Sequence, residues 1–313
     1  MISVESYLKD YKRIPVIVGP TASGKSANAM AMCEQFNGEL ISCDSMQIYR
    51  GLDIGTAKPT HEEQLRVRHH LIDIIDPDGS YSVSDFQRDC YHAIDDVLSR
   101  GKLPVLCGGT GLYISAVVLG LELGDEDEDD TILNELTSEY EAEGIEPIYR
   151  RLCEVDPEAA SKIHPNNTRR VLRAYSVYLK TGRTFTSKNN DSVRSGPVYP
   201  FVLFQPEWDR AELYDRINSR VDIMIEQGLV DEVRWLYDNY GGTGSTAFQA
   251  IGYKEIKPYL DHEISLDAAV TELKTNTRHY AKRQLTWFRR FPRVLMIPPE
   301  SYRNIRVLEQ YLI

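Results

Sequence analysis

The chain has 313 residues, of which 42% are apolar and 27% are charged, and its formal net charge is −11. This balance is ordinary for a globular enzyme of one or two domains; no apolar run approaches the roughly 18 residues that cross a bilayer, and the start of the chain lacks the apolar segment of a secretion signal. We therefore expect a cytoplasmic protein without a membrane partner, and its five scattered cysteines, with no CxxC pair, predict reduced thiols and neither a disulfide framework nor a zinc site.

Residues 14–120 alternate predicted strands and helices. Strands are predicted at 14–19, at 39–43, from His69 and from Leu103. Helices are predicted from the end of the first strand to about Phe36 and over Val83–Arg100. This alternation predicts a P-loop-containing α/β fold with a mostly parallel, doubly wound sheet, whose ligands lie at the carboxyl ends of the strands.

Between the first strand and the first helix, GPTASGKS matches the P-loop pattern GxxxxGK[ST] at every fixed position. Its glycines let backbone N–H groups turn toward an anion, Lys25 neutralises a terminal phosphate, and the Ser26 hydroxyl can ligate Mg²⁺. A chance glycine loop is the alternative, but it requires neither the strand before it nor the helix after it. The predicted phosphate site comprises Gly19, Pro20, Thr21, Ala22, Ser23, Gly24, Lys25 and Ser26.

Three further features follow predicted strands. Asp44 can cap a helix, ligate Mg²⁺ or accept a proton from a nucleophile, and its position alone does not separate these roles. The glycines of GGTGLY, from Gly108, indicate either a tight turn that needs positive φ, the reading we favour, or a backbone surface against which a ligand lies. His69 and His70 have no carboxylate or cysteine at ligand spacing, so we expect them to be structural.

The character of the sequence changes at Gly120. Residues 120–163 hold 15 acids and 3 bases, so that this segment has a charge of −12 and the rest of the chain sums to about +1. No strand is indicated within 121–197, and we predict a helical insertion there, within a core formed by 1–120 and 198–313. Its acidic run, GDEDEDD, is expected to be a solvated loop.

Two stretches are basic although the chain as a whole is acidic. Residues 164–183 contain five bases and no acid, and residues 273–293 contain seven bases and no acid. A basic helix face is usually only solvated, but the absence of acids over such lengths favours a polyanionic partner. The first stretch includes Arg169, Arg170 and Arg173, on a helix that Asn167 can cap and Gly182 can end. The side chains expected to point inward from this helix are Val171, Ala174, Tyr175, Tyr178 and Leu179.

The remaining predicted elements lie on either side of the second basic stretch. Segment 209–240 is predicted to be helical, and Arg220 within it can form a structural ion pair with Asp215 or Asp222. A long helix is predicted over 265–291, with Tyr280 in its apolar stripe, and a final strand is predicted after it. On one face of that helix, at i, i+4 and i+8, lie Lys274, Arg278 and Lys282.

Taken together, these segments resemble the tRNA dimethylallyltransferases, also called tRNA isopentenyltransferases, in their short bacterial form. The matching segments run in family order over 14–293, nearly the whole chain. The most diagnostic pair is the P-loop and, eighteen residues after its final serine, DSMQIYRGLDIGTAKP. The other matching segments are HHLIDIIDP, GGTGLYISAV, HPNNTRRVLRAYSVYLKTGR, RINSRVDIMIEQGLVDEV, IGYKEI and TRHYAKRQLTWFRR.

The resemblance implies an enzyme that moves a dimethylallyl group from dimethylallyl diphosphate to N6 of the adenosine 3′ of the anticodon. It implies tRNA as partner, Mg²⁺ as cofactor, bound at Ser26, and a monomer as the expected state. Asp44 would be the general base, while Lys25 and Arg220 would stabilise the departing diphosphate. The positions expected to contact tRNA are Asp44, Ser45, Met46, Gln47, Thr110, Arg169, Arg170, Val171, Leu172 and Arg173, together with Arg278 and Lys282 of the long helix.

Two departures concern the insertion, where Asn167 and Ser176 stand at positions at which the family often has Asp and Glu. Three alternatives remain open: an enzyme that prenylates free adenine nucleotides, a P-loop kinase of small molecules, and a nucleotide-gated RNA-binding switch. The basic stretch within the insertion favours tRNA over a free nucleotide. The sequence contains no NKxD motif with which a switch would read guanine.

Overall fold

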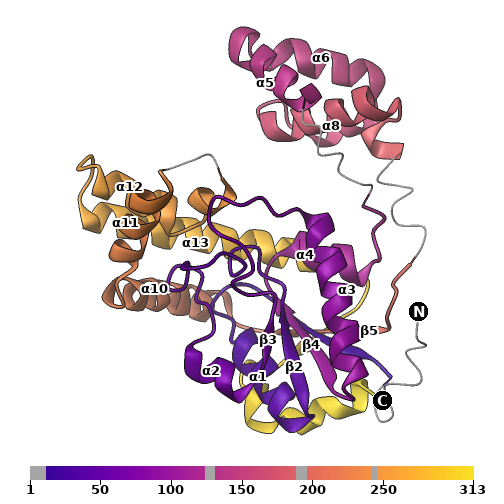
Figure 1. The fold of residues 1–313 in the computed structure, drawn as a ribbon, viewed down its shortest axis with the longest axis vertical. Coiled ribbons are helices and arrows are strands. Elements are labelled where there is room, and N and C mark those ends of the chain that lie inside the picture. The colour runs from indigo at the N-terminus through magenta and orange to yellow at the C-terminus, as the bar shows by residue number, and fades with distance from the viewer. Residues whose placement is uncertain (1–11, 124–130, 188–195, 242–244) are drawn as a thin grey trace. The chain divides into compact units, whose positions relative to one another are not determined.

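The computed structural model describes residues 12–123, 131–187, 196–241 and 245–313. The chain forms two compact units: unit 1 comprises Met1–Val118 and Val198–Ile313, and unit 2 comprises Leu119–Pro197 (Figure 1). Unit 1 has the predicted α/β fold, and the secondary structure described in unit 2 is helical. The start of the chain and the acidic run, expected to be a solvated loop, lie outside the described residues. Among the described helices, none has both the length and the apolar character that crossing a bilayer requires.

The elements of the two units are as follows. The strands of unit 1 are β1 (Ile14–Val18), β2 (Gly38–Ser42), β3 (His69–His70), β4 (Leu103–Gly108), β5 (Phe201–Pro206) and β6 (Val294–Ile297). Its α-helices are α1 (Lys25–Gln35), α2 (His61–Arg66), α3 (Val83–Ser99), α4 (Gly111–Val118), α10 (Arg210–Glu226), α11 (Leu229–Tyr240), α12 (Tyr253–Leu260) and α13 (Leu266–Phe288), and its 3₁₀ segments are η2 (Thr246–Gln249) and η3 (Ser301–Tyr311). The helices of unit 2 whose bounds are described are α5 (Thr131–Glu143), α6 (Glu146–Val155), α7 (Pro157–Lys162) and α8 (Thr168–Thr181).

The strand order of the sheet is β3-β2-β4-β1-β5-β6, and every pairing is parallel. In this register Val18, at the end of β1, lies opposite Gly108, at the end of β4, and Ser42, at the end of β2, lies opposite Cys107. The P-loop, Asp44 and the GGTG segment therefore leave the sheet at one edge. This is the edge at which doubly wound sheets bind their ligands.

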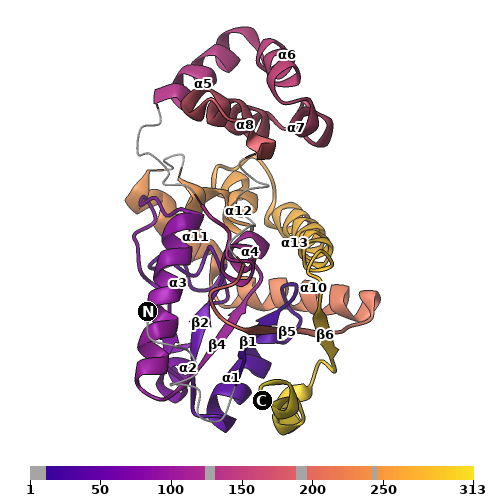
Figure 2. The same ribbon diagram turned by 90° about the vertical axis from the view of Figure 1, so that its right-hand side faces the viewer.

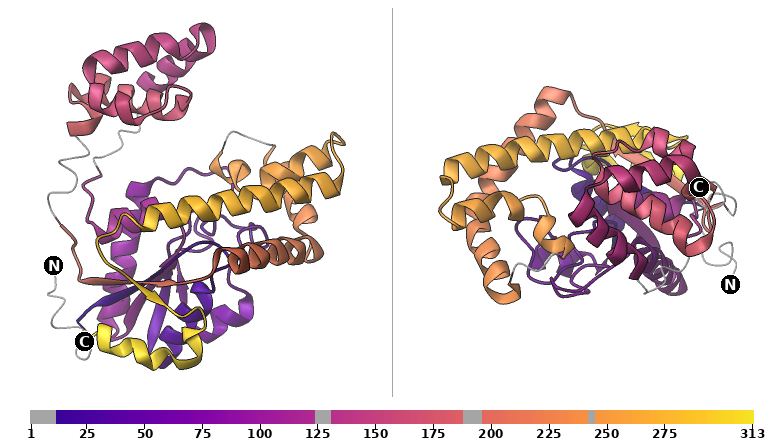
Figure 3. Two further views of the ribbon diagram at one scale, coloured as in Figure 1. Left: turned by 180° about the vertical axis from the view of Figure 1, so that it is seen from behind. Right: turned by 90° about the horizontal axis from the view of Figure 1, so that it is seen from above.

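Helices cover both faces of the sheet. Side chains alternate along a strand, so Val16 and Val18 pack with α3 and α4, while Ile17 packs with α1 and η3. Another cluster joins α11, α12 and α13 to the segment after β2, including Tyr49 and Leu52. Figures 1 and 2 show α10–α13 gathered at one end of the sheet, and Figure 3 shows α13 running beside α10. These helices therefore pack over the edge at which the ligand-binding segments emerge.

A buried carboxylate anchors the other end of β2. Glu39 accepts hydrogen bonds from Lys102 Nζ (2.9 Å) and from Arg100 Nη2 (2.8 Å), and its Oε2 lies 2.7 Å from His70 Nε2. Burial alone would raise the pKa of Glu39, but these hydrogen bonds hold it well below its usual range. The network ties β2 to β3 and to the start of β4, and it confirms that His70 is structural.

The strand predicted from His69 is much shorter than expected. Only His69 and His70 pair with β2, because Leu71 (φ 61°) and Asp73 (φ 53°) take left-handed backbone conformations that end the strand. The chain then returns toward the segment after β2, where the Ile74 and Ile75 N–H groups donate to Ile48 O (2.8 and 3.1 Å). The apolar run was therefore wrongly interpreted as one continuous strand.

In unit 2, α8 has the predicted boundaries. The Asn167 side chain caps its start by accepting a hydrogen bond from the Arg170 N–H, and Gly182, in the left-handed region, ends it. Val171 and Leu172 are buried in the core of this unit, packed with residues of α5–α7. Leu179 was expected to point inward, but 44% of it is exposed, so its place on the predicted apolar face was wrong.

Candidate active site

The P-loop follows β1 and leads directly into α1. Gly24 has φ 80°, a left-handed conformation that glycine adopts without strain, and Ala22 at φ 63° lies in the same region. Because α1 begins at Lys25, the free N–H groups of its first turn face the loop. Loop and helix start together have the form of the anion site that the sequence pattern predicts.

Groups from α10 and the segment before it hold this loop in place. Trp208 Nε1 donates to Ser23 O (2.8 Å), and Arg216 Nε donates to Ala22 O (2.9 Å). The Arg216 guanidinium stacks over the Trp208 ring, 4.4 Å from its centroid. The loop conformation is therefore set by tertiary contacts as well as by its glycines.

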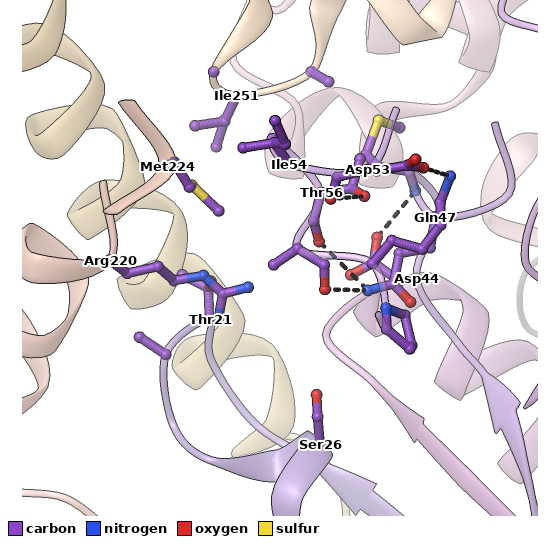
Figure 4. Close-up of a pocket in the computed structure, with 18 of the residues that line it drawn as sticks. Thr21, Ser26, Asp44, Gln47, Asp53, Ile54, Thr56, Arg220, Met224 and Ile251 are labelled. Carbon is purple, nitrogen blue, oxygen red and sulfur yellow. Dashed lines mark hydrogen bonds and ion pairs between the residues drawn. The ribbon is translucent and has the colours of Figure 1, made fainter. Parts of the chain in front are cut away.

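The P-loop opens into a cavity of about 1320 Å³. Its wall includes residues of α10 and α13. It also includes residues 44–47 and 53–60, between β2 and α2. In Figure 4, Arg220 points from α10 into this space; Ile54, Met224 and Ile251 gather on one side, and Ser26 lies on the other. The cavity is therefore lined by charged side chains near the P-loop and by apolar side chains on the side of Ile54, Met224 and Ile251.

Three charged residues named from the sequence meet in this cavity. Burial lowers the pKa of Lys25; the nearby Arg220 guanidinium acts in the same direction and Asp44 opposes it. Burial also lowers the pKa of Arg220, again opposed by Asp44. Among the described residues Arg220 has no ion-pair partner, since Asp222 pairs with Lys274 (2.6 Å), so the structural pair expected within α10 is not formed. Lys25 and Arg220 thus place two cations where a multiply charged anion can bind.

Asp44 has both a local structural bond and an available oxygen. Its Oδ1 accepts from the Met46 N–H (3.0 Å), and no described residue donates to its Oδ2. Thr110 Oγ1 accepts from the Ser45 N–H (2.9 Å) and lies 3.2 Å from the Ser45 hydroxyl. The end of β4 therefore fixes the turn that carries Asp44, and one carboxylate oxygen remains for a ligand in the cavity.

The segment after Asp44 contains no helix and is held by a half-buried carboxylate. Glu232, on α11, accepts from the Asp53 and Ile54 N–H groups (2.9 and 2.8 Å) through Oε2. Its Oε1 accepts from the Gly55 N–H (2.9 Å) and from the Tyr253 hydroxyl (2.6 Å). Four donors converge on one side chain, so α11 determines where this part of the cavity wall lies.

A buried ammonium holds the same segment from within. The Lys58 side chain is 3% exposed, and its Nζ donates to Tyr49 O (2.8 Å) and to the carboxylates of Asp53 and Asp73. Two carboxylates around one cation leave no uncompensated charge on the lysine. Lys58, in the AKP part of the diagnostic pattern, therefore has a structural role: it holds this segment in place.

The GGTG glycines correct an expectation. We favoured a turn that needs positive φ, but Gly108 and Gly109 do not have it. A Cβ at Gly108 would lie 2.2 Å from Cys43 O, and one at Gly109 would lie 2.2 Å from Gln284 Nε2. Gly108 is required because the backbone after β2 approaches too closely for any side chain. A side chain at Gly109 would displace the Gln284 amide on α13.

The other residues expected to bind tRNA have different environments. Ser45 and Met46 line the cavity, as does Gln47, but the Gln47 amide is engaged in hydrogen bonds with Ser42 Oγ (2.9 Å) and with the carbonyls of Thr56 and Ala57. Arg278 donates to Asn218 (2.6 Å), and Lys282 is exposed. In unit 2, Arg169 and Arg170 are exposed and Arg173 is half-buried, whereas Val171 and Leu172 lie in the core. The arginines are thus the side chains of that span that reach the surface of unit 2.

Sequence reasoning missed Glu232, Trp208, Gln284 and Tyr280. Each lies on or beside a predicted helix, and Tyr280 was assigned to an apolar stripe. The structure places Tyr280 in the cavity wall, where burial raises the pKa of its hydroxyl and the neighbouring Asp44 acts in the same direction. The sequence holds no local signal for these roles, because each depends on a partner far along the chain.

The cysteines of the described part of the chain are free, as predicted. Cys107 lines the cavity beside Lys25, and burial raises the pKa of its thiol to about 12. The thiol is therefore protonated near neutral pH and supplies no thiolate as a nucleophile or metal ligand.

Fold and site together define a P-loop α/β protein whose phosphate loop, two cations and one carboxylate share a cavity. A family model described as IPP transferase matches residues 47–291. The chain belongs to the IPP transferase family. The P-loop and Asp44 precede the matched residues, but the relatives below align with nearly the whole chain.

The chain is similar to proteins named tRNA dimethylallyltransferase. That of Acetivibrio thermocellus is 46% identical over 301 residues, covering 95% of this chain and 96% of the relative. That of Oceanobacillus iheyensis is 50% identical over 273 residues, covering 87% of each.

Two solved structures are also similar. The full-length tRNA isopentenylpyrophosphate transferase of Bacillus halodurans superposes with a TM-score of 0.69 at 42% identity, covering 96% of this chain and 97% of that one. A eukaryotic dimethylallyltransferase described as acting on tRNA gives a TM-score of 0.77 at 32% identity, covering 88% of this chain and 70% of that one. The resemblance found in the sequence is therefore confirmed in both sequence and fold.

The Glu232 carboxylate provides a test of how the cavity wall is held. Glu232→Gln keeps the size of the side chain but turns an NH₂ group toward N–H donors, so we expect unfolding in urea to require about 2 kcal/mol less free energy. Its neighbour Asp231, exposed and paired with Arg234, supplies the control Asp231→Asn, which should change stability by less than about 0.5 kcal/mol. Equal stabilities of the two variants would contradict the anchoring role.

Proposed function

We propose that this protein transfers a dimethylallyl group from dimethylallyl diphosphate to the exocyclic N6 of the adenosine 3′-adjacent to the anticodon in tRNA, releasing diphosphate. The observation that carries the proposal is the meeting of the P-loop, Lys25, Arg220 and Asp44 in one cavity. This arrangement combines an anion site for a leaving group with a carboxylate that can take a proton. Membership of the IPP transferase family supports the same reaction.

The proposed reaction is a single displacement. The N6 lone pair attacks C1 of the dimethylallyl group, the N6–C1 bond forms, and the bond from C1 to the diphosphate oxygen breaks. Asp44 accepts a proton from N6, which is a weak nucleophile because its lone pair is delocalised into the ring. The P-loop N–H groups, Lys25 and Arg220 stabilise the negative charge that develops on the departing diphosphate.

The target base is stacked within the anticodon loop and must leave the stack to reach the carboxylate. Asp44 lines the cavity of about 1320 Å³, which we propose receives both the donor and the base. Thr110 and Ser45 fix the turn that holds Asp44 and so position the proton acceptor relative to the base. We propose that these residues form the acceptor side of the site.

The residues present fit a magnesium ion carried with the donor. Among the described residues, no group of three His, Cys, Asp or Glu side chains is placed to hold a metal. The Ser26 hydroxyl is exposed at the start of α1 and lines the cavity, and Mg²⁺ prefers such an oxygen together with phosphate oxygens and water. We propose that Ser26 holds Mg²⁺ with the diphosphate, where the ion would neutralise leaving-group charge.

The central test is transfer from labelled dimethylallyl diphosphate to tRNA or to AMP, each with and without Mg²⁺. We expect label in tRNA only, and only with Mg²⁺. Transfer to AMP at the rate seen with tRNA would instead support the free-nucleotide enzyme. A parallel reaction with labelled ATP should move no phosphate to either acceptor, and phosphate transfer there would support the kinase.

Asp44→Asn tests the proposed base. The amide keeps the hydrogen bond to the Met46 N–H but cannot take a proton, so single-turnover transfer should fall by about 10²–10⁴-fold with tRNA binding retained. Asp78→Asn removes the same charge from an exposed residue outside the cavity wall and should react at the normal rate. Near-normal transfer by Asp44→Asn would remove Asp44 as the base.

The exposed arginines of α8 test the tRNA contact of unit 2. Replacing Arg169 and Arg170 by alanine should weaken tRNA binding and reduce the slope of log K against log salt by about 2, one phosphate contact for each arginine. The control replaces Arg150 and Lys162 of the same unit, an equal loss of charge. If both double variants show the same slope, the contribution is general electrostatics and these arginines are only solvated.

A further inference from the structure

We propose that Gln284 is a positioning residue that couples the P-loop to the turn that carries Asp44. Binding of diphosphate at the P-loop would then order the Asp44 turn, and binding of tRNA at that turn would order the P-loop. The proposal rests on the proposed function, because it assigns donor and acceptor to the two sides of the cavity. Gln284 lies on α13, is 5% exposed and lines the cavity. Buried amides are kept where both their oxygen and nitrogen find partners.

Gln284 joins two loops that leave neighbouring strands. Its Oε1 accepts from the Thr21 N–H (2.9 Å), and its Nε2 donates to Gly109 O (3.0 Å). The orientation of the amide is determined by these partners, since an N–H can only donate and a carbonyl can only accept. One planar group therefore relates the position of the P-loop to that of the GGTG segment.

The connection continues to the carboxylate. Thr110 follows Gly109 directly, and its hydroxyl accepts from the N–H of Ser45, the residue after Asp44. The chain of contacts from Thr21 through Gln284 and Thr110 to the Asp44 turn thus consists of hydrogen bonds and one shared backbone segment. A shift of the P-loop would therefore change the position of Asp44 through the side chains of Gln284 and Thr110.

The middle of this connection is closely packed, so a shift of the Gln284 amide has little room to be absorbed. A Cβ at Gly109 would lie 2.2 Å from Gln284 Nε2, which leaves the amide in direct contact with the backbone. One turn further along α13, Trp287 Nε1 donates to Ser115 Oγ (2.9 Å) and fixes the helix to α4. Packed elements of this kind transmit small displacements well.

The Thr21 N–H is also the one backbone donor of the P-loop turn that a protein side chain occupies in the described structure. Diphosphate bound at the neighbouring N–H groups would therefore fix the loop against Gln284 instead of competing with it. By thermodynamic linkage, a ligand that orders this contact raises the affinity of a second ligand on the other side, and the effect is reciprocal.

The test measures the Kd of tRNA with and without saturating magnesium diphosphate, a product that allows no turnover. For the wild type we expect diphosphate to tighten tRNA binding by a factor within the usual range of about 5–150. In Gln284→Met, which has nearly the same volume but neither hydrogen bond, that factor should approach one. Single-turnover transfer should fall by about 10²-fold, as misplacement of reacting groups commonly does.

Gln87→Met is the matched control. Gln87 Nε2 donates to Ala116 O (2.6 Å) within the α3–α4 packing and does not line the cavity. We expect Gln87→Met to lose about as much stability as Gln284→Met but to keep the coupling factor and the transfer rate of the wild type. A second variant, Gly109→Ala, displaces the Gln284 amide from the loop side and should reduce the same factor even if Gln284→Met does not fold.

The outcomes separate two failures. A wild-type protein that prenylates no tRNA would refute the proposed function. If the wild type transfers normally, two results would overturn the role of Gln284 alone. One is a wild-type coupling factor of one. The other is a coupling factor in both Gln284→Met and Gly109→Ala that equals the wild-type factor. Equal loss of coupling in Gln87→Met would also overturn it, because general destabilisation would then account for the effect.

Discussion

The parallel register of three neighbouring strands is the constraint on which the rest of the structure depends. Because β1 and β2 both pair with β4, the P-loop, Asp44 and the GGTG segment must emerge side by side. The approach is so close that Gly108 touches the backbone of Cys43, and any side chain there would push β2 and β4 apart. The P-loop and the turn that carries Asp44 are thus placed by the backbone hydrogen bonds of the sheet.

The helices of the second half of unit 1 complete the site. α10 holds the P-loop through Arg216 and adds the Arg220 guanidinium to the cavity. α11 holds the segment after Asp44 through Glu232, and α13 adds Gln284 between the two loops. Side-chain hydrogen bonds therefore replace regular secondary structure where the chain must present polar groups to a substrate.

The sequence predicted best where the responsible residues are adjacent. The P-loop needs only a strand, eight consecutive residues and a helix, and α8 needs only the cap at Asn167 and the glycine that ends it. The strand from His69 was wrongly extended, because an apolar run does not reveal that Leu71 and Asp73 turn into the left-handed region. The GGTG glycines were misinterpreted because the partner of Gly109 lies 175 residues further along the chain.

By itself, the sequence determined the fold class, the phosphate loop, the position of Asp44 at the end of a strand, and the two basic stretches. These follow from local pattern, hydrophobic periodicity and charge, which short segments contain completely. Only the tertiary structure decided that Arg220 lies near Asp44 and has no ion-pair partner within the described part of the chain, while Lys274 pairs with Asp222. It also decided that Lys58 and Glu232 serve as anchors. The physical reason is that a side chain is available to a substrate only if no other part of the fold uses it, and that depends on contacts between distant segments.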